Sequence, residues 1–185
     1  MIIAASSCFH RNNLNLAGIR CKYEGHAVKT LPLRVITVGK NRSRGTQLLV
    51  DEYAGKLNYY CRFEVVLVRS NPKNAHDVLA QIEGEDMAVM NLIKPNDMVI
   101  IFDEVGEDIN SRQMADLIGD AGLTGASRIV FCIGGPYGHG IRSRKRANKL
   151  LKLSSLTLNH QIALVVLMEQ LYRAWTILKG QKYHH

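Results

Sequence analysis

The chain has 185 residues, of which 46% are apolar, and it carries a formal net charge of +8. This length suits one domain whose core can fold without disulfides or structural metals. The longest apolar stretch outside the first 30 residues, 162–168, is far too short to cross a membrane. The positive charge favours an anionic partner such as RNA, with a merely solvated basic surface as the alternative.

The first 30 residues differ in composition from the rest of the chain. They contain four basic residues and one acidic residue, Glu24, and they are rich in Ser, Asn and Ala. This composition is typical of an organellar transit peptide rather than a secretory signal. We therefore expect a leader at 1–30, a folded domain at 31–185, and a chloroplast more than a mitochondrial location. An ordinary disordered N-terminus is the alternative.

The cysteines do not indicate a metal site or a disulfide framework. None of them forms a Cys-x-x-Cys pair, and their spacing matches no zinc motif. The sequence therefore predicts free thiols and a reducing compartment, with no metal. The four positions are Cys8, Cys21, Cys61 and Cys132.

Strands and helices are predicted to alternate along the chain. Short, apolar, β-branched runs predict strands at 33–38, 63–68, 98–102, 128–133 and 152–156. Helical periodicity predicts helices at 45–60, 74–92, 112–117 or beyond with Ser111 as the cap, 141–150 and 162–178. Near-continuous apolar strands that alternate with helices indicate an α/β fold with a mainly parallel sheet and helices on both faces.

A glycine-rich turn follows the fourth predicted strand, with the sequence Gly134-Gly135-Pro136-Tyr137-Gly138. Glycines let the backbone approach a ligand closely, and ligands of open α/β sheets bind beyond the carboxyl ends of the strands. The turn matches neither a dinucleotide fingerprint nor a phosphate-binding loop, which disfavours NAD and ATP. A sharp turn that needs glycine for its own geometry is the alternative.

Several segments occur together in an order that points to a known family. They are Arg34 to Lys40, Phe102-Asp103, the glycine turn, Leu153 to His160, and Tyr172 to Trp175. In this order they resemble the ribosomal large-subunit pseudouridine methyltransferase H family of the SPOUT superfamily, over roughly residues 33–184. The resemblance implies a trefoil knot near the C-terminus, which is an exception to the unknotted rule. It also implies S-adenosyl-L-methionine as the methyl donor and large-subunit rRNA as the substrate.

The resemblance also implies where the cofactor lies. In that family the ends of three successive segments wrap S-adenosylmethionine, and apolar side chains enclose the adenine ring. Transferred to this chain, the cofactor residues are Phe102, Gly134, Gly135, Leu153, Ser154, Ser155, Leu156, Thr157 and Leu158. The family commonly has an aliphatic residue at the position of Phe102, so we expect that contact to be made mostly by the backbone. Pattern alone predicts a strand and a turn for the run from Leu153 to Leu158.

The family's acceptor atom is N3 of a pseudouridine, whose proton must leave before or during methyl transfer. The resemblance implies Arg173, Tyr183 and His184 as the residues that assist this step. The alternatives are an ion pair of Arg173 with Glu169 and a frayed terminus. The family continues Tyr-His-Arg-Glu, whereas this chain has Tyr183-His184-His185.

A run of basic residues follows the glycine turn and is the predicted contact with the RNA backbone. Four of them share one face if the helix extends over 141–150. A solvated helix face is the alternative. The predicted RNA-binding residues are Arg142, Arg144, Lys145, Arg146 and Lys149.

The last predicted helix is apolar on more sides than one core-facing stripe requires. The surplus indicates a subunit interface, and the resemblance implies a homodimer whose site is completed by the partner's tail. A helix fully buried in its own core is the alternative. Two other functions stay open, namely a non-catalytic rRNA-binding assembly factor and a methyltransferase that acts on another nucleotide or a ribose oxygen.

Overall fold

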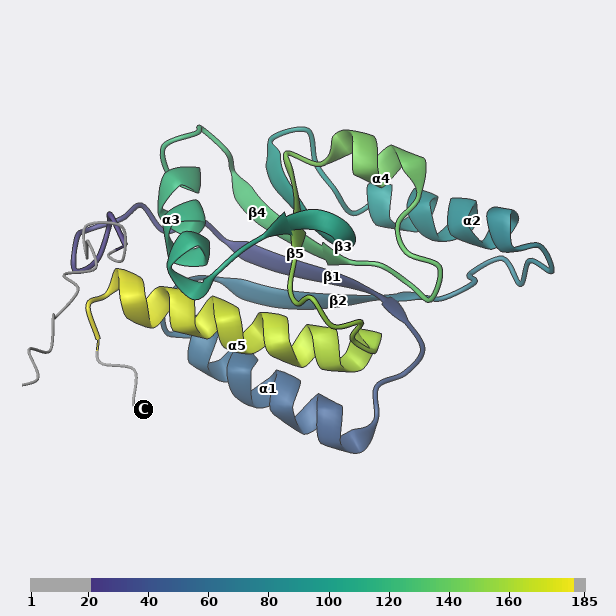
Figure 1. Ribbon diagram of the computed structural model, residues 1–185, viewed down its shortest axis with the longest axis horizontal. Coiled ribbons are helices and arrows are strands. Elements are labelled where there is room, and N and C mark those ends of the chain that lie inside the picture. Colours follow the sequence, from purple (N-terminus) through teal and green to yellow (C-terminus); the bar gives the residue numbers. More distant parts are fainter. Residues whose placement is uncertain (1–20, 182–185) are drawn as a thin grey trace, which may run out of the picture.

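A sheet of five parallel strands forms the centre of the structure, a computed structural model that describes residues 21–181 (Figure 1). The strands are β1 (Leu33–Gly39), β2 (Phe63–Arg69), β3 (Asp97–Asp108), β4 (Arg128–Ile133) and β5 (Lys149–Lys152). Their order across the sheet is β2-β1-β4-β3-β5, and every neighbouring pair is parallel. The predicted parallel α/β architecture is confirmed, while the trefoil knot stays a prediction.

Helices cover both faces of the sheet, as predicted (Figure 1). The helices are α1 (Arg44–Asn58), α2 (Val78–Met90), α3 (Ser111–Ala121), α4 (Ile141–Arg146) and α5 (His160–Leu178). Helices α1, α3 and α5 share one apolar core with Leu33 and Val35 of β1. The neighbouring β1 residues Ile36 and Val38 belong to a second core on the α2 face. This alternation follows from the period of two along a strand.

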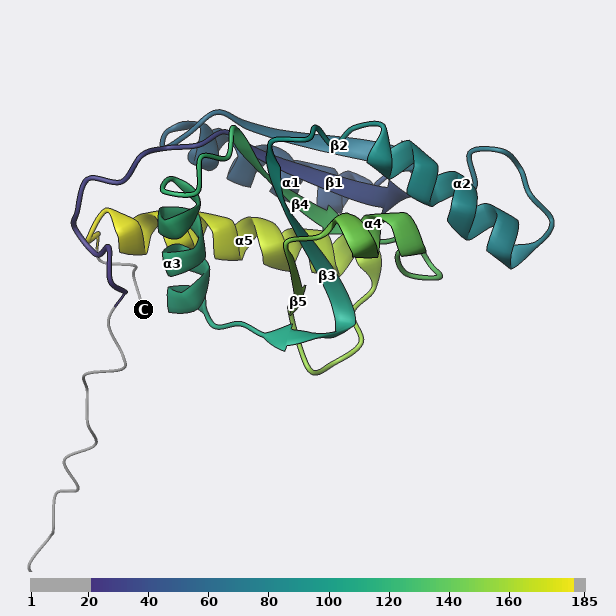
Figure 2. The ribbon, with the colours of Figure 1, turned by 90° about the horizontal axis from the view of Figure 1, so that it is seen from above.

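Helix α5 is the main component of the larger core. Leu167, Leu171 and Trp175 are fully buried, and the Trp175 ring stacks on Tyr60 with centroids 5.8 Å apart. Figure 2 shows α5 extending from the α3 end of the molecule toward the end at which α4 lies. Burial of aromatic side chains of this size makes α5 a major source of stability.

Several element boundaries differ from the prediction. Strand β3 continues to Asp108, where the predicted strand ends at 102, and helix α2 begins at Val78 rather than 74. Helix α4 ends at Arg146 and β5 begins at Lys149, so the predicted helix 141–150 is too long. The cause is Asn148, whose backbone N–H and side-chain oxygen both bond to Val99 of β3 at 2.8 Å and start the strand pairing. Residues 153–159 form a loop where a strand at 152–156 was predicted. Helix α3 is capped by Asn110, not Ser111, through a capping box with Gln113.

Residues 21–30, which we assigned to the leader, pack against the domain. The Cys21 thiol donates to Asp116 at 3.1 Å, the Tyr23 hydroxyl donates to Asp120 at 2.5 Å, and both acceptors lie on α3. Gly25 N–H bonds to Leu178 O at 3.0 Å. The folded part therefore includes Cys21, and the predicted leader otherwise lies outside the described residues. Within 21–181, no helix is both long and apolar enough to span a membrane.

The buried carboxylate of Asp86 fixes the position of α4. Asp86 lies on α2 and accepts the backbone N–H groups of Arg142 and Ser143, each at 2.9 Å, and the Ser143 hydroxyl. These are the first-turn N–H groups that a helix cannot satisfy itself. Gly140 is required beside it, because an added Cβ would lie 2.3 Å from Asp86 Cγ. Asp86 thus provides, from another helix, the capping acceptor that the N-cap residue Gly140 lacks.

We expect Asp86→Ala to lower the free energy of unfolding by about 3 kcal/mol, because several buried donors lose their acceptor. The matched control is Asp77→Ala, which removes the exposed N-cap of α2 and should cost about 1 kcal/mol. Urea unfolding of both variants measures the difference. Equal losses would show that Asp86 is no more than an ordinary cap.

Candidate functional site

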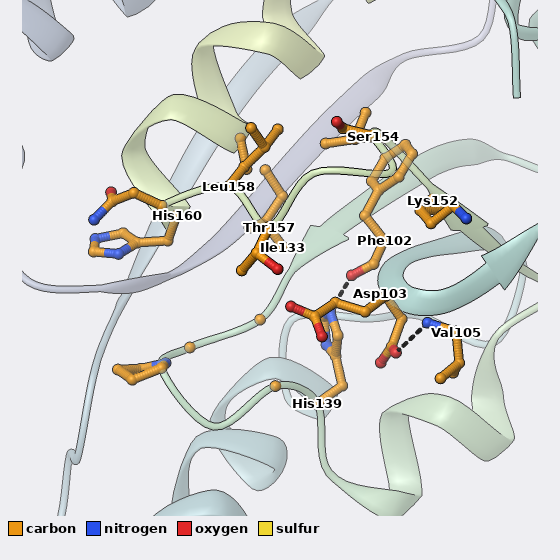
Figure 3. A pocket seen from close by; sticks show the side chains of 18 of the residues that line it. Phe102, Asp103, Val105, Ile133, His139, Lys152, Ser154, Thr157, Leu158 and His160 are labelled. Atoms are coloured by element: carbon orange, nitrogen blue, oxygen red, sulfur yellow. Dashed lines mark hydrogen bonds between the residues drawn. The ribbon is translucent and has the colours of Figure 1, made fainter. Parts of the chain in front are cut away.

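A cleft of about 630 Å³ opens at the carboxyl ends of β4, β3 and β5 (Figure 3). Its walls are the end of β3, the glycine turn after β4, the loop after β5 and the first residues of α5. Because parallel strands place their carboxyl ends at one edge, three chain segments that are distant in sequence meet here. This edge is where ligands of open α/β sheets bind.

The glycine turn is tight and cannot accept side chains at its first two positions. An added Cβ at Gly134 would lie 2.8 Å from the backbone carbon of Gly138, and one at Gly135 would lie 2.5 Å from Glu85 Oε2. Gly138 N–H closes the turn on Gly135 O at 3.0 Å, and Gly138 has a φ of +80°. The glycines are therefore needed by the turn itself, which leaves its backbone facing the cleft.

Phe102 contributes its backbone to the cleft, as expected, while its side chain belongs to the core. The ring is 7% exposed and stacks on Phe131 at a centroid distance of 6.1 Å. Its carbonyl oxygen faces His139 Nε2 at 3.1 Å (Figure 3). Since a carbonyl can only accept, Nε2 carries the proton of this hydrogen bond.

His139 was missed by sequence reasoning although it directly follows the glycine turn. Its side chain is buried, and this burial lowers the pKa of the imidazole below its usual value. The ring is therefore neutral near pH 7, with Nε2 as donor and Nδ1 as acceptor. His139 ties the glycine turn to the end of β3, so the two walls of the cleft keep a fixed separation.

An ion pair between Asp103 and Arg144 forms another part of the wall. The two side chains approach to 2.8 Å, and the Asp103 side chain is only 7% exposed. Both residues line the cleft. Arg144 was predicted to bind RNA from the surface of a helix, but here it is neutralised by a carboxylate at the end of β3. Asp103 belongs to the Phe102-Asp103 motif, but the sequence did not indicate a role for its side chain.

The loop after β5 brings most of the predicted cofactor residues to the cleft. Leu153, Ser154, Leu156, Thr157 and Leu158 line it, whereas Ser155 does not. Leu153 and Leu158 pack against the core, and Leu156 is 76% exposed. The Ser154 hydroxyl accepts Leu156 N–H at 2.9 Å and shapes the loop locally. The cofactor role of these residues stays a prediction.

His160 begins α5 and closes the cleft on the β1 side. Its ring contacts Gly39 so closely that an added Cβ there would lie 3.0 Å from His160 Nε2. This nitrogen is buried and has no hydrogen-bond partner among residues 21–181. The preceding Asn159 caps the helix by accepting Gln161 N–H at 2.9 Å. A buried imidazole nitrogen at the edge of a cleft can bond to a ligand or a water.

Of the three predicted catalytic residues, the described part of the chain contains only Arg173. Arg173 lies on α5, and two of its guanidinium nitrogens donate to the same oxygen of Glu169, at 2.8 and 3.0 Å. Arg173 lies thirteen positions after His160 on the same helix, which amounts to about 20 Å. Arg173 is not among the residues that line the cleft of its own chain. Tyr183 and His184 lie outside the described residues.

The basic helix face that we predicted to bind RNA does not form on α4. Arg142 pairs with Glu83 at 3.2 Å, and Arg146 donates to the backbone oxygens of Lys94, Pro95 and Asp97. Lys149 lies on β5, so it does not share a helical face with the others. Lys145 is exposed. The sequence shows where the basic residues lie, but it does not show the acceptors that Arg142 and Arg146 bind within the protein.

Comparisons with known proteins agree with this architecture. The family described as "Predicted SPOUT methyltransferase" matches residues 31–184. An Arabidopsis thaliana protein named "Putative RNA methyltransferase" is 67% identical over 168 residues, which cover 91% of this chain and 87% of that protein. The ribosomal RNA large subunit methyltransferase H of Geobacter metallireducens is 34% identical, covering 84% of this chain and 99% of its own length.

Two further matches are a second bacterial sequence relative and a solved structure. The ribosomal RNA large subunit methyltransferase H of Clostridium botulinum strain Kyoto is 37% identical over 82% of this chain and 98% of its own. The crystal structure of the SpoU methyltransferase AviRb from Streptomyces viridochromogenes, in complex with S-adenosylmethionine, covers 80% of this chain and 58% of that chain. It aligns with a TM-score of 0.39 at 13% identity. On the family match and the sequence relatives, the chain belongs to the SPOUT methyltransferase family.

Proposed function

We propose that this protein transfers a methyl group from S-adenosylmethionine to N3 of a pseudouridine in large-subunit rRNA. The observation that carries the proposal is the cleft where the end of β3, the glycine turn and the loop after β5 converge. This cleft occurs in a SPOUT methyltransferase with relatives named ribosomal RNA large subunit methyltransferase H. The pseudouridine specificity follows from those relatives rather than from a residue of the cleft.

The residues present suit an adenosyl ligand. The cleft combines the half-buried Leu153 and Leu158 with the open backbone of the glycine turn and the hydroxyls of Ser154 and Thr157. Such an arrangement can enclose a flat ring between apolar groups and read its edge with polar ones. When bound, the cofactor supplies an electrophilic methyl group on a sulfonium. The protein's part is to orient both reactants and to accept a proton.

The proton on N3 requires a base or a group that stabilises the anion. Within residues 21–181, the cleft contains two imidazoles. His139 bonds to Phe102 O, whereas His160 Nε2 has no hydrogen-bond partner in the described part of the chain. We assign the proton transfer to the predicted terminal His184, with Tyr183 to contact the base and Arg173 to hold negative charge. The non-catalytic assembly factor remains as the outcome if no transfer is found.

These assignments require a second subunit. Arg173 is about 20 Å along α5 from His160, so we propose that it acts at the cleft of a partner chain. Two exposed apolar side chains lie near the cleft and could be buried in such an interface. They are Leu156, which is 76% exposed, and Ile162, which is 53% exposed. We propose a homodimer through α5 in which each tail completes the partner's site. We also propose an organellar location, the chloroplast before the mitochondrion, on the composition of the N-terminal residues.

Methyl transfer is the direct test of the proposed function. Protein and labelled S-adenosylmethionine are incubated with ribosomes from a bacterial strain that lacks this methyltransferase. We expect label on a pseudouridine of the large subunit, located by nuclease digestion and mass spectrometry. Label on a different nucleotide would replace the pseudouridine assignment. Cofactor binding without transfer would favour the assembly factor.

Mixed subunits test whether the site is shared. Gly134→Ala blocks the glycine turn and Arg173→Ala removes the guanidinium, and each alone should reduce transfer by about 100-fold or more. When the two variants are unfolded and refolded together, a mixed dimer regains one intact site. Activity should then return to about a quarter of the wild-type value, because half of the dimers are mixed. No recovery, despite dimers of normal size, would place Arg173 outside the partner's site.

The buried His139 predicts a pH dependence of stability. Its pKa is lowered in the folded state, so below about pH 6.5 the unfolded chain takes up a proton that the native state resists. Stability from this group is present above that pH and is lost as the pH falls. Below pH 6.5, the free energy of unfolding of the wild type should therefore fall more steeply than that of His139→Gln, by up to about 1.4 kcal/mol per pH unit. Urea unfolding at several pH values measures both slopes. Parallel pH profiles would contradict the assignment.

A further inference from the structure

We propose that a second cleft, at the carboxyl ends of β1 and β2, binds a backbone phosphate of the RNA substrate. This inference rests on the proposed function, because it names the surface that holds the RNA beside the reacting nucleotide. The cleft has a volume of about 640 Å³. It is lined by Gly39, Lys40, Asn41, Leu67, Arg69, Ser70, Asn71 and Asn74.

The second cleft adjoins the first. Gly39 lines the second cleft and contacts the ring of His160, which lines the first. Gly39 is also the register partner of Arg69 in the parallel pair of β1 and β2. Lys40 and Arg69 therefore emerge at the same sheet edge as the cofactor cleft. A nucleotide whose base enters the first cleft would carry its neighbouring phosphates past this edge.

The charge of the second cleft suits an anion. Lys40 and Arg69 are exposed, and neither forms an ion pair with a carboxylate among residues 21–181. None of the lining residues is acidic, and the exposed Asn41 and Asn74 add amide donors. Lys, Arg and Asn are side chains that contact nucleic-acid phosphates. The cations of α4, in contrast, are mostly occupied by Glu83, Asp103 and backbone oxygens.

A buried carboxylate holds the rim of the second cleft in place. Glu85 Oε1 accepts the Ser70 hydroxyl at 2.7 Å, Asn71 N–H at 2.8 Å and the Gln81 amide at 2.9 Å. The Asn71 side chain bonds both to the N–H and to the oxygen of Ala75, at 2.7 and 2.9 Å. Ser70 and Asn71 thus shape the cleft, and only the second N–H of Asn71 Nδ2 has no acceptor among residues 21–181. The main groups available to a phosphate are those of Lys40, Arg69, Asn41 and Asn74.

The same carboxylate links the two clefts. Glu85 Oε2 is buried, has no partner within the described chain, and lies where a Cβ on Gly135 would be 2.5 Å away. Glu85 therefore packs against the glycine turn on one side and anchors the rim of the second cleft on the other. Through this contact, the spacing between the phosphate position and the cofactor cleft is fixed by one side chain.

The test compares Lys40→Gln/Arg69→Gln with the wild type. Binding of a hairpin RNA with a single-stranded loop is measured by fluorescence anisotropy over a range of salt concentrations. The slope of log affinity against log salt should shrink by about 1.4, because each single-strand phosphate contact contributes about 0.7. Calorimetry should give an unchanged affinity for S-adenosylmethionine, because both side chains lie outside the first cleft.

The matched control is Lys29→Gln/Arg112→Gln, which removes the same charge from two exposed positions outside both clefts. The salt slope of the control should equal that of the wild type. If the slope of the control shrinks as much as that of the cleft variant, the effect comes from net charge alone and the proposal is overturned. An unchanged slope in the cleft variant would overturn it as well. Dissociation of that variant to monomers would assign the cleft to a subunit contact instead. Failure of the wild type to transfer methyl groups to ribosomes would reject the proposed function itself, and this result is independent of the salt slope.

Discussion

The pairing of β5 with β3 is the contact on which the site depends, because it places the loop after β5 beside the glycine turn after β4. The pairing shifts register between Phe102 and Glu107 as β3 continues past the sheet edge. The chains approach so closely there that an added Cβ at Gly106 would lie 2.3 Å from the backbone of Leu151. Backbone packing at this distance fixes the start of the loop, while Ser154, Leu153 and Leu158 hold the rest of it by side-chain contacts. Ser154 and Thr157 still line the cleft, where their O–H groups can donate to a ligand.

Helix α5 joins the stability of the fold to the geometry of the site. Its buried face, which includes Leu167, Leu171 and Trp175, ties α1 and α3 to the sheet. Its first residue, His160, closes the cofactor cleft, and Arg173 lies about 20 Å further along. A rigid helix cannot bring both residues to one ligand. The separation therefore requires either that Arg173 has a purely structural role with Glu169, or that the functional unit contains two chains.

The sequence predicted the strands and the glycine turn well because those signals are local. Apolar β-branched runs mark β1 to β4, and the turn follows β4 at the sheet edge as expected. The errors came from contacts that are distant in sequence. Asn148 ends α4 early because it bonds to Val99, and the acceptor that caps α4 is Asp86 on another helix. His139 and Asp103 were passed over for the same reason, since their roles depend on Phe102 O and Arg144.

The fate of the basic residues shows why a charge count does not locate an RNA surface. The run after the glycine turn contains the densest positive charge of the chain, yet Arg142, Arg144 and Arg146 all have acceptors within the protein. Arg144 and Arg146 hold the wall of the cleft and the end of α4 in place, and the charge of Arg142 is balanced by Glu83 at the surface. Lys40 and Arg69 are fewer, but they lie at the sheet edge beside the cofactor cleft and form no ion pair with the described carboxylates. An anion is attracted by the positive charges that no nearby carboxylate neutralises, and tertiary structure determines which charges those are.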